Sequence, residues 1–188
     1  MAMRERTREK ILDAADELFF SVGVAATPID AVIQRAGVSS ATLYRGFDGK
    51  EGVLAAALER RHLAWMRAWD AAIAAQPSAG GRLLAVFDAL DLFRQQPTGS
   101  RWCAFLGSAA EFADPPAAVA EAVRRDTDTM RERLAEIAAE VDPARADALA
   151  DAMLLIVTGD LAMRLRDPAH STATARALAA ALVESIAP

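Results

Sequence analysis

Two residue types that carry much of protein chemistry are scarce in this sequence. The 188 residues include one cysteine, Cys103, and two histidines, His62 and His170. A single cysteine cannot form an intramolecular disulfide, and this set of thiols and imidazoles is too small for the usual zinc sites. We therefore expect no disulfide, no bound metal and no other cofactor.

Long apolar runs are also missing. No uninterrupted run reaches the length of a membrane-spanning helix, and the charged residues 1–10 lack the apolar core of a signal peptide. The sequence predicts a soluble cytoplasmic protein with no membrane partner.

Residues that favour β-strands are few or scattered. The chain has one tyrosine, the β-branched residues are dispersed, and alanine dominates. This composition favours helices over sheets. Because 53% of the residues are apolar, the chain can build a sizeable core. We predict an all-α protein.

The net charge is −5, which excludes a generally basic nucleic-acid binder. Residues 1–50 contain seven Lys or Arg and seven Asp or Glu residues, so this segment is neutral. Any affinity for a nucleic acid must therefore come from cations placed on one face.

Apolar residues at helical spacing, interrupted by Gly and Pro, predict about nine helices. The expected ranges are about 3–22, 28–36, a short helix after Ser39, 49–74, 82–95, 101–112, one ending near 141, one ending near 166 and one ending near 186.

Two of the short helices are joined by a tight turn, Ala36-Gly37-Val38-Ser39. Thr27 is expected to cap the first of them, with Pro28 at its first position and Asp30 completing a capping box. Gly37 should end that helix and Ser39 should cap the next. This order is typical of a helix-turn-helix.

Residues 7–54 read TREKILDAADELFFSVGVAATPIDAVIQRAGVSSATLYRGFDGKEGVL. This segment resembles the N-terminal domain of the TetR family of regulators. The resemblance implies an N-terminal three-helix DNA-binding domain, placed at residues 1–50, and a C-terminal helical domain for effector binding and dimerisation, placed at residues 51–188. Residues 102–115, WCAFLGSAAEFADP, resemble more weakly a segment of the C-terminal domain in one TetR subgroup.

The helix after Ser39 offers small or polar side chains that can enter a major groove. The family resemblance implies phosphate contacts for Tyr44 and Lys50. Residue Gly46 stands where the family often has a bulkier residue. The basic residues between Arg4 and Lys10 are either a solvated tail or further backbone contacts. The predicted DNA-binding residues are Thr27, Ser39, Ser40, Ala41, Thr42, Tyr44, Arg45 and Lys50.

Aromatic and methionine side chains are concentrated on the helices expected to surround an effector. They are either pocket residues or ordinary core. The predicted ligand-binding residues are Trp65, Trp69, Phe87, Phe93, Trp102, Phe105, Met130 and Met153. Cys103 is either a redox sensor or an inert small apolar residue, and His62 is either a ligand contact or a packed histidine.

The last two predicted helices carry small and medium apolar residues on one face. Paired with a second subunit they would form an isologous four-helix bundle, whereas the alternative is burial within one chain. The predicted dimer-interface residues are Ala152, Leu155, Ile156, Gly159, Met163, Leu178, Ala179 and Leu182.

Together these patterns predict a homodimeric repressor that a small hydrophobic effector releases from a palindromic double-stranded DNA operator. Two alternatives stay open: a regulator controlled by a protein partner, and an all-helical enzyme. Against the enzyme, the sequence contains no nucleophile–base pair, no metal set and no glycine-rich phosphate loop.

Overall fold

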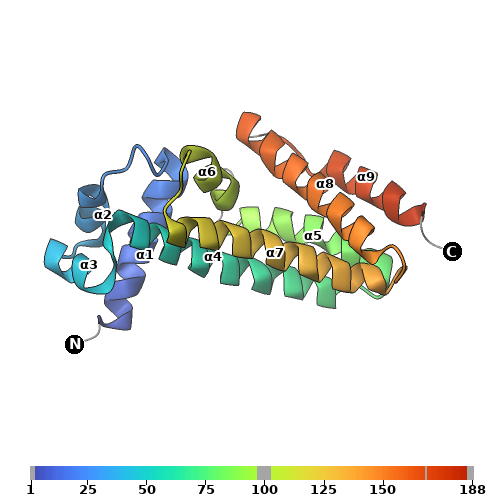
Figure 1. Ribbon diagram of the computed structural model, residues 1–188, viewed down its shortest axis with the longest axis horizontal. Helices are drawn as coiled ribbons and strands as arrows, with labels where there is room; N and C mark the ends of the chain where they lie inside the picture. Colours follow the sequence, from blue (N-terminus) through green and yellow to red (C-terminus); the bar gives the residue numbers. More distant parts are fainter. Residues whose placement is uncertain (1–2, 97–102, 168, 186–188) are drawn as a thin grey trace. The chain divides into compact units, whose positions relative to one another are not determined.

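A computed structural model describes residues 3–96, 103–167 and 169–185. Within these ranges the chain forms nine helices and no strand, so the prediction of an all-α protein is confirmed (Figure 1). The helices are α1 (Glu5–Val22), α2 (Ile29–Ala36), α3 (Ser40–Gly46), α4 (Gly49–Ala74), α5 (Ala79–Arg94), α6 (Ala104–Glu111), α7 (Ala117–Ala139), α8 (Ala146–Arg166) and α9 (Ala173–Glu184).

The turn between α2 and α3 forms as its residues predict. Gly37 has φ +65° and ψ +39°, a left-handed conformation that glycine adopts without steric cost. The next amide, of Val38, donates back to the Ile33 carbonyl at 3.3 Å. The Ser39 hydroxyl then accepts from the Thr42 N–H at 3.2 Å, which caps α3. Local sequence therefore sets the angle between these two helices.

The start of α2 differs from the prediction. Pro28 occupies the cap position, no side chain caps the helix, and the capping box with Asp30 is absent. Thr27 instead turns inward, where it is 3% exposed, and its hydroxyl donates to the Gly23 carbonyl at 2.7 Å. The predicted Thr27 cap is wrong because the hydroxyl donates instead to the half-buried Gly23 carbonyl at the end of α1.

Helix α5 also begins earlier than predicted, at Ala79 and not at residue 82, so it includes the glycine pair at 80–81. The Ser78 hydroxyl accepts from the Gly81 N–H at 3.1 Å, so a serine cap offsets the poor helix propensity of the two glycines. The α8 helix begins at Ala146.

Backbone contacts divide the chain into two compact units. Unit 1 comprises Met1–His62 and Trp102–Arg124, and unit 2 comprises Leu63–Arg101 and Arg125–Pro188. The boundary predicted at residue 50 lies inside unit 1, at the start of α4. The functional division at that residue stays a prediction.

The core of unit 1 joins the three N-terminal helices to α6 and to the starts of α4 and α7. Ile11, Leu43 and Leu54 are completely buried there, and Phe105 of α6 is 8% exposed. His62 is 7% exposed and lies edge-on to Phe105, with 6.4 Å between ring centres, so it packs in the core of unit 1. Helix α6 is therefore part of the same packed body as α2 and α3.

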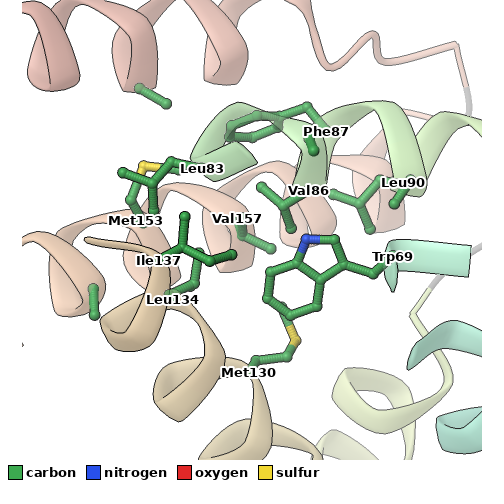
Figure 2. Close-up of a cluster of buried hydrophobic side chains, with 14 of the residues drawn as sticks. Trp69, Leu83, Val86, Phe87, Leu90, Met130, Leu134, Ile137, Met153 and Val157 are labelled. Atoms are coloured by element: carbon green, nitrogen blue, oxygen red, sulfur yellow. The ribbon is translucent and has the colours of Figure 1, made fainter. Parts of the chain in front are cut away.

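The core of unit 2 is built from α4, α5, α7, α8 and α9. Figure 2 shows Trp69 of α4 among Val86 and Leu90 of α5 and Met130 of α7. Burial of these large side chains supplies most of the driving force for packing the unit.

A buried polar cluster joins α5 to the end of α8 and the loop before α9. The Asp160 carboxylate is fully buried, 3.0 Å from both the His170 ring and the Arg164 guanidinium. The Thr172 hydroxyl donates to Asp91 of α5 at 2.7 Å. A buried carboxylate needs such partners to offset its desolvation, so the cluster fixes the geometry of the α8–α9 turn.

None of the helices in the described ranges is apolar enough over a sufficient length to cross a membrane.

Candidate nucleic-acid interface

Helix α3 has one buried and one exposed face. Leu43 is completely buried and Phe47 is 8% exposed, one helical turn apart, so these two side chains attach the helix to unit 1. The opposite face carries Tyr44, which is 56% exposed. The other residues of the predicted contact surface that are exposed are Ser39, Ser40, Ala41 and Arg45, while Thr42 and Lys50 are half-buried.

Several cations of unit 1 are neutralised by acids of the same unit. Arg35 of α2 lies 2.6 Å from the Glu17 carboxylate of α1. Arg60 of α4 lies 2.8 Å from both Glu9 and Asp13, and it also pairs with Asp16. These pairs attach α2 and α4 to α1. Any positive surface potential around α3 must therefore come from other cations of unit 1.

Two charged groups of this α1–α4 contact have shifted pKa values. Burial raises the pKa of the Asp16 carboxyl, although the Arg61 and Arg60 guanidinium groups oppose the shift. Burial also lowers the pKa of Arg61, whose guanidinium lies 4.7 Å from the centre of the Phe20 ring. Desolvation is the larger cause for both groups, so Asp16 and Arg61 form the buried part of the contact between α1 and α4.

An open groove of about 580 Å³ lies beside the start of α3. Residues from three segments line it: Arg6, Thr7 and Lys10 of α1, Gly37, Val38 and Ser39 of the turn, and Thr42 of α3. Two of the predicted DNA-binding residues, Ser39 and Thr42, therefore share a surface with the basic start of α1.

Thr27 is the predicted DNA-binding residue whose surroundings differ most from the prediction. Its hydroxyl donates to the Gly23 and Leu18 carbonyls, and its backbone N–H donates to the Val24 carbonyl at 3.2 Å. Both donors of Thr27 therefore form hydrogen bonds within the protein.

Glu111 is a residue that sequence reasoning missed. Its carboxylate, at the end of α6, accepts from the backbone N–H groups of Val24 at 3.0 Å and Ala25 at 2.6 Å. Two consecutive backbone N–H groups form a concave site that suits a carboxylate. The contact joins residues 86 and 87 positions apart, so no local sequence signal could have revealed it.

The predicted ligand-binding residues divide between the two units. Trp65, Trp69, Phe87, Met130 and Met153 are buried in unit 2, with Phe93 packed against them. Phe105 belongs to unit 1, and Trp102 lies outside the described residues. The two remaining tryptophans stack with 5.7 Å between ring centres. Neither indole N–H of this pair has an acceptor among the described residues.

The predicted dimer face is mostly open on the single chain. Leu155 is 74% exposed, Leu178 is 59% exposed and Met163 is 43% exposed. Gly159 is also exposed, while Ala152, Ile156 and Leu182 are half-buried. Ala179 differs, because it is completely buried within its own chain.

A tight turn between α2 and α3, an exposed polar α3 face and an all-helical remainder define a helix-turn-helix DNA-binding protein. Comparisons with known proteins agree with this class. Residues 11–57 match the family model described as "Bacterial regulatory proteins, tetR family". Residues 11–57 therefore form a TetR-family DNA-binding domain, which supports the family and the helix-turn-helix fold predicted from the sequence.

Among curated proteins, the HTH-type transcriptional regulator SrpR of Pseudomonas putida is 36% identical over 88 residues, which cover 42% of this chain and 41% of SrpR. The uncharacterised HTH-type transcriptional regulator TtgW, also of Pseudomonas putida, is 35% identical over 88 residues, 42% of this chain and 66% of TtgW. The chain thus spans less than two thirds of these relatives.

Solved structures match over nearly the whole chain. SCO4454, a TetR-family transcriptional regulator from Streptomyces coelicolor, has a TM-score of 0.88 at 26% identity, covering 98% of this chain and 91% of that one. The reduced form of E. coli NemR has a TM-score of 0.76 at 18% identity, covering 96% and 97%. The second likeness concerns the fold alone.

Proposed function

We propose that this chain is a dimeric cytoplasmic repressor that binds a palindromic DNA operator through α3 and leaves it when a small apolar effector binds. The observation that carries the proposal is the two-sided α3. Leu43 and Phe47 fix the helix, while Ser40, Tyr44 and Arg45 face outward. A helix attached in this way can enter a major groove without losing its core contacts.

The exposed residues divide by the part of DNA that they suit. Arg45 can donate two hydrogen bonds to a guanine, and Ser40 and Ala41 are small enough to let the helix approach base edges. Lys50 and the Tyr44 hydroxyl suit phosphates, which position a protein but carry no sequence information.

The experiment begins with selection of binding sites from a random duplex library by the full chain, followed by affinity measurements at several salt concentrations. We expect two inverted half-sites. Lys50→Ala should weaken binding to selected and random DNA alike and reduce the log–log salt slope by about 0.9 per subunit. Arg45→Ala should relax the preference at a single base position. Failure to enrich any sequence would contradict the proposal.

The proposed effector binds in unit 2, at the aromatic group of Trp65, Trp69 and Phe93. Phe93 lies edge-on to Trp65, with 5.9 Å between ring centres. A buried donor without an acceptor costs about 1–3 kcal/mol. An aromatic effector with an oxygen acceptor would therefore gain from both burial and the two indole N–H groups.

Tryptophan emission can test this site. In a Trp102→Phe variant, emission comes only from Trp65 and Trp69, since the chain has three tryptophans. An apolar aromatic ligand should change the emission and release DNA over the same concentration range. Release by polyanionic metabolites alone, with unchanged emission, would contradict the proposed effector class.

The proposed dimer uses the face formed by Leu155, Gly159 and Met163 of α8 and Leu178 of α9. Exposed leucines of this size are costly to leave in water, and pairing two copies of the face would bury them. A two-fold partner would also present two α3 helices to the two half-sites of a palindrome.

A further inference from the structure

The groove beside α3 contains two basic side chains that face no acid. Arg6 and Lys10 are one helical turn apart on α1, so they project from the same side of the helix. Both are exposed, and neither forms an ion pair with any described residue. The seven lining residues include no Asp or Glu.

Contacts with α3 and the residue after it hold the start of α1 in place. The side chain of Met3 lies so close to Gly46 that a Cβ added at position 46 would clash with the Met3 Cε atom. Arg8 lies over the Phe47 ring, 5.8 Å from its centre. The thioether thus occupies the space that a larger residue at position 46 would fill, and these contacts place the start of α1, with Arg6 and Lys10, beside α3.

We propose that Arg6 and Lys10 bind the phosphodiester backbone of the operator, which makes α1 a DNA-contacting element in addition to α3. This inference rests on the proposed function. The groove suits a DNA strand for two reasons. Its lining includes Ser39 and Thr42 at the start of α3, and the charged side chains that line it are all positive. Two backbone phosphates along the groove, one for each cation, would then lose their condensed counterions on binding.

Arg35 provides a matched control within the same unit. It is exposed like Arg6, but its guanidinium is 2.6 Å from the Glu17 carboxylate. Removing Arg35 changes the net charge of the chain as much as removing Arg6 does. Loss of affinity through net charge alone would therefore appear in both the Arg6 and the Arg35 variants. Loss of a contact in the groove would appear in the Arg6 variant and not in the Arg35 variant.

The test measures affinity for selected and random DNA from low to moderate salt with the full chain and with Arg6→Ala, Lys10→Ala and Arg35→Ala. Arg6→Ala and Lys10→Ala should each reduce the log–log salt slope by about 0.9 per subunit. Each should also lower the affinity for selected and for random DNA roughly three- to tenfold. Arg35→Ala should leave the slope unchanged. Thermal unfolding followed by circular dichroism checks that each variant is folded.

Hydroxyl-radical footprinting supplies a second readout. The Arg6→Ala, Lys10→Ala double variant should lose protection at some of the backbone positions that the unchanged chain protects. Protection at the half-site positions that α3 contacts should stay the same. Unchanged slopes and footprints, with Lys50→Ala still reducing the slope, would overturn this inference and leave the proposed function intact. Equal losses in Arg35→Ala would also overturn it. Absence of sequence-selective DNA binding by the unchanged chain would overturn both.

Discussion

The Glu111 carboxylate is expected to stabilise the loop that leads into the helix-turn-helix. It accepts from two consecutive backbone N–H groups, of Val24 and Ala25, at 3.0 and 2.6 Å. Replacing Glu111 by Ala removes both acceptors. Replacing it by Gln keeps one carbonyl oxygen but turns an NH₂ group toward the second N–H, so one bond is lost and two donors face each other.

The magnitude follows from the number of bonds and their exposure. A hydrogen bond to a charged group contributes about 1.5–3 kcal/mol when buried. Glu111 and Ala25 are exposed, and water replaces part of each lost bond. We therefore expect Glu111→Ala to cost about 1–2 kcal/mol and Glu111→Gln about 1 kcal/mol. A loss of 1.4 kcal/mol corresponds to about tenfold faster exchange of amides protected by this contact.

Amide hydrogen exchange resolved by NMR measures the effect at the two donors themselves. The Val24 and Ala25 amides should lose protection in both variants, more in the Ala variant. Glu132→Gln, an exposed substitution on α7 in unit 2, is the control and should leave these amides unchanged. Identical exchange of Val24 and Ala25 in all four proteins would refute the assigned role of Glu111.

Two further predictions concern Thr27 and the dimer face. Thr27→Val should destabilise unit 1 by about 1–2 kcal/mol, because the half-buried Gly23 carbonyl loses its 2.7 Å donor, while Thr27→Ser should keep most of the stability. A Val variant that unfolds normally but binds DNA poorly would show instead that the hydroxyl contacts phosphate. Gly159→Arg should give monomers in sedimentation, since a Cβ there meets nothing within 4 Å of its own chain and the protomer can stay folded. Leu92→Arg, at a 56% exposed α5 leucine outside the proposed face, should remain dimeric, and an intact Gly159→Arg dimer would place the interface elsewhere.

The parts of the fold that the sequence predicts are those specified by neighbouring residues. Gly37 and Ser39 each act within four positions of themselves, through a left-handed turn and a helix cap. The buried positions of α3 follow from the helical spacing of Leu43 and Phe47. Such short-range signals locate the helix-turn-helix without any knowledge of the rest of the chain.

The features that the sequence does not predict depend on distant residues. Thr27 is a different case, because its acceptor, the Gly23 carbonyl, is only four residues away. Thr27 satisfies the local rules for a cap, but the fold of the α1–α2 loop decides which of two local hydrogen bonds its hydroxyl forms. Glu111 is one acidic residue among many until α6 packs beside the α1–α2 loop. Asp160 is likewise recognisable as a buried ion-pair centre only after His170 has been brought back to it.

Charge shows how long-range pairing changes a sequence-level conclusion. Residues 1–50 are neutral by count, which alone gives no reason to expect affinity for a polyanion. In the structure three of their acids, Glu9, Asp13 and Asp16, pair with Arg60, which lies outside this segment. A cation supplied by α4 therefore neutralises acids of α1. The groove beside α3 is then lined by Arg6 and Lys10 and by no Asp or Glu, so a neutral segment can present a positive face to DNA.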